Sequence, residues 1–270
     1  QGTISGGSLI IKSNSVENTG TITDCAITSG ASSDWINNGE ISGGTLTMTA
    51  GDFDNSGSII DCDIDVNIGG DFSNLSGATI SGGTLTITAG DFNNRGSISD
   101  CDIDVNTGGS FENNSGATIS GGTLDIIRSG GLCTNSGTIT GEITVSIQSG
   151  ELTNYGTISG GKYTIETGCT LNNYNTISGG TFSGNGRICW YDSTISGGTF
   201  NCVLDGGASS NTGIVSKAHI NGDIHYGGIF ENTCIFGDGA YVWNDFQGTI
   251  KLSVTADGKT KDINYGANVL

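Results

Sequence analysis

Hydrophobic and polar residues alternate in short runs along most of this chain, and glycine-rich segments separate the runs. In TLTMT, residues 45–49, the alternation places Leu46 and Met48 on one face of an extended strand and the threonines on the other. A period of two residues, rich in β-branched side chains and bounded by glycine turns, predicts short β-strands. We therefore predict an all-β protein without helices.

These runs recur with a fixed period. Residues 41–79 and 80–118 are identical at 31 of 39 aligned positions, and each of these units divides into two similar halves. The repeating unit is therefore a segment of 18–21 residues, which we call a rung. Each rung opens with an isoleucine: Ile4, Ile22, Ile41, Ile59, Ile80, Ile98, Ile119, Ile139, Ile158, Ile177 and Ile195. A long fixed period is typical of a solenoid, in which each rung buries its apolar side chains against the next.

The second half of each rung contributes three further columns of equivalent residues. The apolar column is Val16, Trp35, Phe53, Phe72, Phe92, Phe111, Cys133, Leu152 and Leu171. The asparagine column is Asn18, Asn37, Asn55, Asn74, Asn94, Asn113, Asn135, Asn154 and Asn173. The glycine column is Gly20, Gly39, Gly57, Gly77, Gly96, Gly116, Gly137 and Gly156. Amides stacked about 4.8 Å apart can hydrogen-bond in a row, so we predict an asparagine ladder, with glycine as a positive-φ turn residue beside it.

The predicted fold is a single-stranded parallel β-helix, or β-solenoid, with about eleven regular rungs. At about 4.8 Å per rung, the regular part would form a rod of about 50 Å. We assign 1–213 to the solenoid, 214–249 to an irregular β cap or last coils, and 250–270 to a C-terminal β segment that opens a following module. Aromatic residues concentrate in the second segment, which favours a cap because an open solenoid end pairs edge to edge.

Composition and charge exclude several classes of protein. The chain has 48 glycines and no proline, which argues against collagen and against proline-rich disorder. A net charge of −18 disfavours nucleic acid and anionic membrane surfaces as partners. No apolar run reaches the length of a membrane span, so membrane insertion is not expected. Because the chain starts inside a repeat, we expect it to be part of a longer, multi-domain protein.

The cysteines fit the rung pattern. Cys25, Cys62 and Cys101 take the inward position that Gly44 and Gly83 hold in alternate rungs, about 9.6 Å apart along the axis. This separation exceeds the reach of a disulfide or of one shared metal ion, so we interpret them as small buried hydrophobic residues. Cys133 replaces an aromatic residue in the core. Cys169 and Cys189 lie in neighbouring rungs, where both a bridge and free thiols are consistent with the spacing. Cys202 and Cys234 are not assigned to a column.

The outward positions carry threonine rungs that alternate with aspartate rungs. Our main interpretation is structural, because the alternation keeps like charges two rungs apart and threonine favours strands. Two functional alternatives stay open. The carboxylates Asp61, Asp63, Asp65, Asp100, Asp102 and Asp104 are candidate ligands for Ca²⁺, although no ordered loop motif accompanies them. A flat threonine array would suit an ice-binding solenoid, but the aspartate rungs interrupt it.

The sequence offers little for catalysis. β-Helix enzymes that cleave polysaccharides gather carboxylates with Lys or Arg in a cleft formed by long loops, whereas these rungs are short and uniform. The three arginines, Arg95, Arg128 and Arg187, are scattered. The two histidines, His219 and His225, lie in the irregular segment, where a structural role is the commoner one. We expect neither an enzyme nor a cofactor, and a polysaccharide lyase or hydrolase is the alternative.

Two groups of repeats are similar to this chain. The corner motifs DFDNSGS, DFNNRGS and LTNYGTI resemble repeats of filamentous-haemagglutinin-type adhesins, and this implies a right-handed parallel β-helix. The ISGGTF segments at 177–182 and 195–200 are similar to β-helix repeats in surface proteins of gut Firmicutes. The recurring cysteines depart from the haemagglutinin-type pattern. Residues 250–270, with a DG turn and a closing YG, resemble the opening of a Listeria–Bacteroides repeat.

The resemblance and the repeats lead to one functional expectation. We expect a non-catalytic, extracellular segment of a bacterial cell-surface adhesin that presents a flat repetitive face to a host glycan or a surface protein. Tyr226, Tyr241 and Trp243 are the candidate binding residues, since aromatic rings stack on carbohydrate. The alternatives are the polysaccharide-active enzyme and, third, an ice-binding or calcium-stabilised solenoid.

Overall fold

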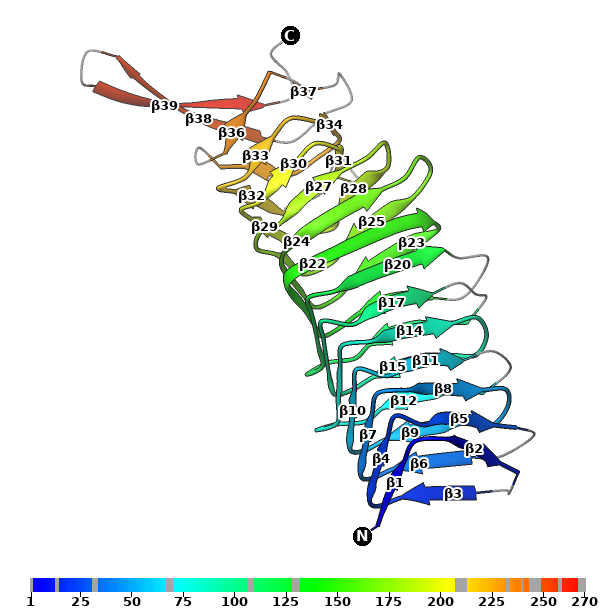
Figure 1. Ribbon diagram of the computed structural model, residues 1–270. Coiled ribbons are helices and arrows are strands. Elements are labelled where there is room, and N and C mark those ends of the chain that lie inside the picture. Colours follow the sequence, from blue (N-terminus) through cyan, green and yellow to red (C-terminus); the bar gives the residue numbers. More distant parts are fainter. Residues whose placement is uncertain are drawn as a thin grey trace.

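The chain winds into a parallel β-solenoid of about 11 turns, as predicted (Figure 1). The computed structural model describes residues 2–12, 15–30, 34–66, 70–105, 109–127, 132–206, 213–231, 234–238, 240–242, 249–256 and 259–266. Strands within this part of the chain form two sheets, a 26-stranded sheet A and a 13-stranded sheet B. A regular rung supplies two strands to sheet A and one to sheet B.

The strands have the following bounds. The first strands of the rungs are β1 (Thr3–Ser5), β4 (Thr21–Thr23), β7 (Glu40–Ser42), β10 (Ser58–Ile60), β13 (Thr79–Ser81), β16 (Ser97–Ser99), β19 (Thr118–Ser120), β26 (Thr176–Ile177), β29 (Thr194–Ser196), β32 (Ile214–Ser216) and β35 (Ile229–Phe230). The second strands are β2 (Ser8–Ile11), β5 (Ala26–Ser29), β8 (Thr45–Met48), β11 (Asp63–Val66), β14 (Thr84–Ile87), β17 (Asp102–Val105), β20 (Thr123–Ile127), β27 (Thr181–Ser183), β30 (Thr199–Phe200), β33 (His219–Ile220) and β36 (Ile235–Phe236). In β22 (Thr138–Ser149) and β24 (Thr157–Ile165) the first two strands are continuous. Sheet B contains β3 (Ser15–Asn18), β6 (Asp34–Asn37), β9 (Phe53–Asn55), β12 (Phe72–Asn74), β15 (Phe92–Asn94), β18 (Phe111–Asn113), β21 (Cys133–Asn135), β23 (Glu151–Asn154), β25 (Thr170–Asn173), β28 (Arg187–Trp190), β31 (Val203–Asp205), β34 (Asp223–His225) and β37 (Tyr241–Val242).

Neighbouring rungs pair in register, so that equivalent residues stack. Ile59 pairs with both Ile41 and Ile80 in sheet A, and Phe72 pairs with both Phe53 and Phe92 in sheet B. Inward residues are buried and the alternating residues are not, as predicted for the strand TLTM. The register follows from the strict period of two, because a slip of one residue would turn every apolar side chain to solvent.

The core is built from stacked columns. Trp35, Phe53, Phe72, Phe92 and Phe111 form an aromatic column with ring centroids 4.9–5.4 Å apart. A second buried column, Tyr163, Phe182 and Phe200, lies inside sheet A later in the chain. Each fully buried large side chain contributes about 1.5–3 kcal/mol relative to exposure, and each contribution requires a neighbouring rung.

The predicted asparagine ladder is present. The Nδ2 amide of each asparagine donates to the Oδ1 of the next at 2.7–2.9 Å, from Asn18 through Asn173. Most of these Nδ2 groups also donate to a backbone carbonyl of the following rung, as Asn55 does to Thr79. The ladder ends where Asn173 donates to the Ser193 hydroxyl, because Trp190 takes the next inward position.

The explanation predicted for the glycine column was largely wrong. Only Gly77 and Gly116 of that column have positive φ. The others are glycine because the rungs approach too closely there. A Cβ atom on Gly39 would overlap the carbonyl oxygen of Gly20, and one on Gly57 would overlap that of Gly39. The requirement for close backbone approach comes from stacking and is not a property of the local turn.

The cysteine column is as predicted, and the pair left open is not bridged. Cys25, Cys62 and Cys101 are buried, and each follows an aspartate with positive φ in its turn. All eight cysteines are free thiols. The register of β25 and β28 explains the missing bridge. Cys169 has the inward parity of Leu171, whereas Cys189 pairs with the outward Asn172, so the two thiols lie on opposite faces of sheet B.

The predicted separation of like charges fails at one rung. Asp65 pairs with Thr47 and Thr86, as the alternation requires. Asp104, however, lies directly beside Asp125 of the next rung. Burial raises the pKa of the Asp125 carboxyl, and the Asp104 carboxylate raises it further. The alternation of threonine and aspartate rungs therefore breaks at the rung of Asp125.

The segment 214–249 continues the solenoid with shorter strands. β32 through β37 keep the parallel pairing of the regular rungs, as in Val215 with Phe230. Phe230 is buried and stacks edge-on against Trp190, so part of the aromatic cluster fills the core. Beyond it, β38 (Thr249–Ala256) pairs parallel with β35 and antiparallel with β39 (Lys259–Gly266). The C-terminal segment is therefore a β-hairpin attached to the last rungs (Figure 1).

Candidate binding surface on sheet B

The outward positions that depart from the repeat gather beside sheet B in the C-terminal half. They comprise a tyrosine stack and a hollow that contains charged side chains. We call the two together the sheet B surface, and it consists of Tyr155, Tyr174, Tyr191, Arg187, Asp205, His225 and Tyr226.

The tyrosine stack occupies the column that follows the asparagine ladder. In this column the backbone N–H donates to the carbonyl of the asparagine one rung earlier, for example from Tyr174 to Asn154 at 2.8 Å. Earlier rungs hold Asn38, Ser56, Leu75, Arg95, Asn114 and Ser136 at this position. Tyr155, Tyr174 and Tyr191 replace them in three consecutive rungs. The asparagine ladder therefore fixes the backbone hydrogen bonding of this column, and only the side chain differs from rung to rung.

The three rings lie nearly parallel. Ring centroids are 5.1 Å apart between Tyr155 and Tyr174 and 4.6 Å apart between Tyr174 and Tyr191. Tyr155 is 53% exposed and Tyr174 is 44% exposed. Since neighbouring rings cover one another's faces, the stack presents ring edges and a row of hydroxyl groups. The row of ring edges and hydroxyl groups can bind a polar partner that lies along the rod. A partner can stack on a tyrosine face only at the two ends of the tyrosine stack.

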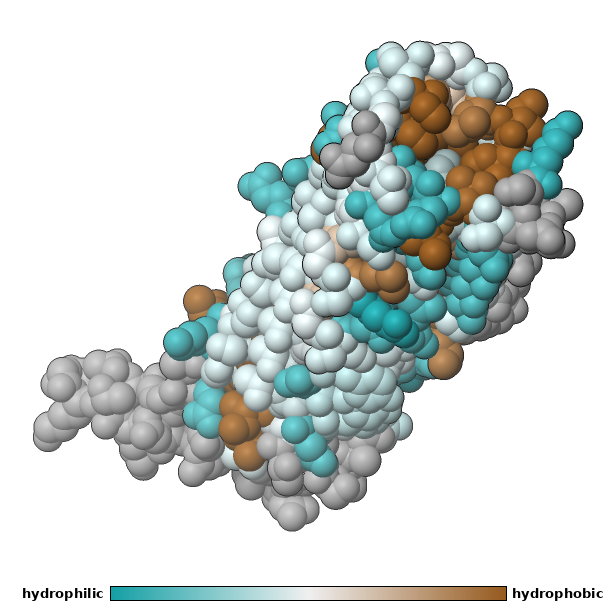
Figure 2. All heavy atoms as spheres, turned by 90° about the horizontal axis from the view of Figure 1, so that it is seen from below, coloured by the Kyte–Doolittle hydropathy of each residue, from teal (hydrophilic) through white to brown (hydrophobic). Residues whose placement is uncertain are grey.

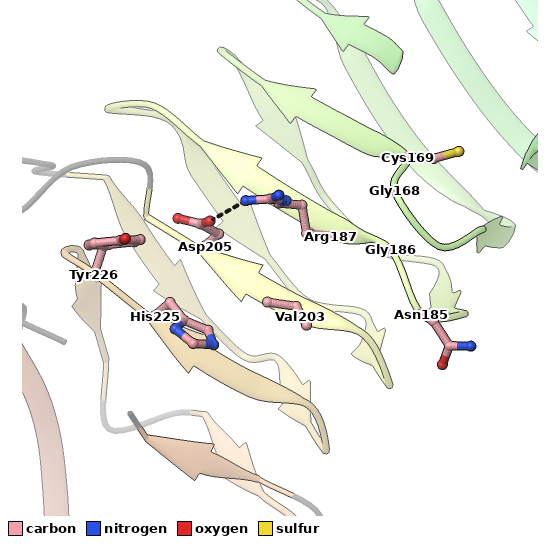
Figure 3. Close-up of a pocket in the computed structure, with 9 residues that line it drawn as sticks. All are labelled: Gly168, Cys169, Asn185, Gly186, Arg187, Val203, Asp205, His225 and Tyr226. Atoms are coloured by element: carbon pink, nitrogen blue, oxygen red, sulfur yellow. Dashed lines mark hydrogen bonds and ion pairs between the residues drawn. The ribbon is translucent and has the colours of Figure 1, made fainter. Parts of the chain in front are cut away.

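The hollow lies on the outer side of β28, β31 and β34 and has a volume of about 400 Å³. Arg187, Val203, Asp205 and His225 come from these three strands, and Tyr226 follows β34. Arg187 Nη1 donates to Asp205 Oδ2 at 3.2 Å. The Asp205 side chain is 8% exposed and that of Arg187 is 56% exposed. Figure 3 shows Arg187 reaching toward Asp205, with His225 and Tyr226 on the neighbouring segment and the Cys169 thiol pointing away.

The stack and the hollow meet at Cys189. Burial, and next the Asp205 carboxylate, together raise the pKa of the Cys189 thiol to about 11. Burial also raises the pKa of the Tyr191 hydroxyl to about 12, with Cys189 as the next cause. These effects place Cys189, Tyr191 and Asp205 within one electrostatic neighbourhood. At neutral pH the thiol and the phenol are therefore both protonated.

The candidates from the sequence fall in different places. Tyr226 lines the hollow, whereas Tyr241 is not among the lining residues and pairs with Asp223 from β37, and Trp243 is outside the described residues. Asp61 and Asp100 are turn residues with positive φ, while Asp63 and Asp102 accept hydrogen bonds from Thr84 and Thr123. Asp65 and Asp104 point outward beside them. Within the described part of the chain, no three His, Cys, Asp or Glu side chains come together as a metal site.

Sequence reasoning missed most of the sheet B surface. Arg187 and His225 were treated as scattered or structural, and the register brings both to one hollow. Asp205 was not considered at all. The tyrosine stack had a readable signal, because Tyr155 and Tyr174 each follow a ladder asparagine directly. Within the hollow only Tyr226 was predicted, since Arg187 is 18 residues from Asp205 and 38 from His225 in the sequence.

The remaining surface is less distinctive. Figure 2 shows a broad pale area of intermediate hydropathy along the rod, and hydrophobic residues gathered at one end. A second hollow of about 300 Å³, on sheet A, is lined by glycines and threonines with Glu142 and Lys162. None of the residues described belongs to a helix that is long and apolar enough for a membrane span.

Comparison with family models, with curated proteins and with solved structures finds no match to this chain. The class of this protein is therefore defined by its fold. The parallel rungs in register and the continuous asparagine ladder make this chain a β-solenoid.

Proposed function

We propose that this chain is a non-catalytic, extracellular segment of a bacterial surface adhesin, a rigid rod that engages a glycan or a protein of another cell through the sheet B surface. One observation carries the proposal. The inward positions stay buried through the C-terminal half, while outward positions change to aromatic and charged side chains on a single surface. Exposed tyrosines and arginines are the residues that most often dominate binding energy.

The shape of the molecule supports the same function. Nearest-neighbour stacking produces a stiff rod, and the described rungs pair in register along its length. A rod of this kind projects a binding surface away from the cell without needing to move. The resemblance of its corner motifs to adhesin repeats agrees with this role.

The test is binding of the purified chain to a glycan array and to host cells. We compare the wild type with the double variant Tyr155→Ser/Tyr174→Ser, because serine occupies the same column at Ser56 and Ser136. Binding should weaken at least about tenfold, as expected for loss of interface hot spots. The control is Leu132→Ser, an exposed apolar residue of an earlier rung. Equal binding of both variants, or no binding by the wild type, contradicts the proposal.

A second candidate, a polysaccharide lyase, is favoured by the hollow, which brings Asp205, Arg187 and His225 together. A glycoside hydrolase is less well supported, because it needs two carboxylates and Asp205 is the one carboxylate among the lining residues of this hollow. Incubation with uronate-containing polysaccharides tests the lyase. Unsaturated products that form with the wild type and disappear in His225→Ala would establish it, and their absence would dismiss it.

A further inference from the structure

We propose that the hollow formed by Arg187, Asp205, His225 and Tyr226 is a subsite for one neutral pyranose unit of a glycan. This inference rests on the proposed binding function and names the ligand class of one part of the sheet B surface. A volume of about 400 Å³ falls within the usual range of small-molecule sites, toward its lower end.

The charge of the hollow favours a neutral ligand. The chain as a whole carries −18, with only 9 basic residues. In the hollow, however, the Asp205 carboxylate is paired with Arg187. An acidic sugar would meet this carboxylate and the negative field of the rod, whereas a neutral sugar would meet a balanced pair.

The polar groups suit adjacent hydroxyl groups. A hydroxyl both donates and accepts, so it can donate to the Asp205 carboxylate and accept from the Arg187 guanidinium. The guanidinium has five N–H donors, and the bond to Asp205 uses Nη1 of a side chain that is 56% exposed. A fork of planar donors beside a carboxylate matches two neighbouring hydroxyls of a pyranose ring.

Tyr226 supplies an apolar surface for the ring carbons. Its side chain is 41% exposed. The His225 ring is tilted by 42° at 6.3 Å and does not cover it as the rings of the tyrosine stack cover one another. A sugar can therefore pack its C–H groups against this face.

The backbone at Tyr226 also points to a ligand. Its φ is 57°, in the left-handed region where a bulky residue is rare. Strained residues of this kind cluster at binding sites, where the surrounding structure holds a side chain in a required place. Glycine would suit the backbone better and would remove the ring.

The experiment titrates methyl glycosides of neutral hexoses and of glucuronic acid into the full chain, followed by ligand-observed NMR and calorimetry. We expect at least one neutral glycoside to bind and the glucuronide to bind more weakly. Tyr226→Gly, which relieves the backbone, should weaken binding at least about tenfold. Arg187→Lys, which keeps the charge and loses the fork, should weaken it as well. Leu132→Ser, an exposed apolar residue of an earlier rung outside the hollow, is the control.

Three results would overturn the inference: no neutral glycoside binds, the glucuronide binds more tightly, or Tyr226→Gly binds as the wild type does. The proposed function fails separately. If glycans or cells bind in a manner that depends on Tyr155 and Tyr174 but not on Tyr226, the adhesin proposal stands and the subsite falls. If methyl glycosides bind to the chain but neither glycans of the array nor host cells do, the subsite is supported and the adhesin proposal is contradicted.

Discussion

Residues 41–118 and residues 151–226 share one backbone geometry and differ in what they display. In both regions equivalent residues pair in register, for example Ile80 with Ile98 and Ile177 with Ile195. In the first region the asparagine ladder and the phenylalanine column are unbroken, and the outward residues are mostly Thr, Ser and Asp. In the second, Trp190 ends the ladder, tyrosines stack outside and a hollow forms.

The difference shows which positions of a solenoid are constrained. Inward residues pack against their neighbours in two rungs, so they stay buried along the rod even where the residue type changes. Outward residues stack only loosely, and a new side chain there leaves the ladder intact. We therefore expect stability to depend on the repeated region and binding to depend on the outward changes.

The largest expected effect is on the asparagine ladder of the first region. Asn94→Ala removes the amide that accepts from Asn74 and donates to Asn113. The buried Asn113 Oδ1 then loses its ladder donor, and Asn74 Nδ2 keeps only its longer bond to the Ser97 carbonyl. We expect a loss of about 3–5 kcal/mol in the free energy of unfolding, measured with urea. Asn93→Ala, on the outward side of the same strand, should cost less than about 0.5 kcal/mol. Similar losses in both variants would contradict the distinction between inward and outward positions.

The second prediction concerns the cysteine column and alkaline pH. Burial raises the pKa of Cys62 and of Cys101 to about 12, from about 8.5 in an unfolded chain. Between these values the unfolded thiol ionises while the folded thiol stays protonated, so stability falls as pH rises. The fall is about 1.4 kcal/mol per thiol per pH unit, or about 2–3 kcal/mol for both by about pH 9.5. Cys62→Ala/Cys101→Ala should flatten the slope of stability against pH, and an unchanged slope would refute the assignment.

The third prediction tests the core of the second region. The Tyr163 hydroxyl is buried and has no hydrogen-bond partner among the described residues, while Phe182 and Phe200 hold the same column. Tyr163→Phe should stabilise the fold by about 1 kcal/mol, because it removes an unpaired polar group. Phe182→Tyr is the reverse change and should destabilise the fold. Loss of stability in Tyr163→Phe, measured by thermal unfolding, would speak against this explanation.

The smallest expected effect lies at the boundary between the regions, where Asp104 and Asp125 are in adjacent rungs. Asp125→Asn should stabilise the fold by about 0.5 kcal/mol at pH 7, since like charges across strands repel. The raised pKa of Asp125 favours its protonation in the folded state. The gain should therefore shrink as the pH falls and Asp125 takes up a proton. Asp65→Asn, between two threonines, should show no such gain in the same unfolding assay.

Much of the scaffold was predictable because stacking makes it nearly one-dimensional. The period identified Asn94 and Phe92 as ladder and core residues, and both predictions were confirmed. The glycine column was identified, but the reason for Gly39 was wrong, since it depends on the neighbouring rung's backbone. The bridge left open between Cys169 and Cys189 required the parity of each residue in its strand, which the spacing did not show.

The sequence by itself determined the solenoid, its rung length, its ladder and its register, because each depends on a repeat that can be read along one chain. Only the tertiary structure decided which irregular residues meet. Arg187, Asp205 and Tyr226 share a hollow because three rungs of unequal length align their strands in sheet B. Stacking brings residues that are far apart in the sequence to within a few ångströms of each other in neighbouring rungs. Because the loops differ in length, a fixed sequence period does not show which of these residues meet.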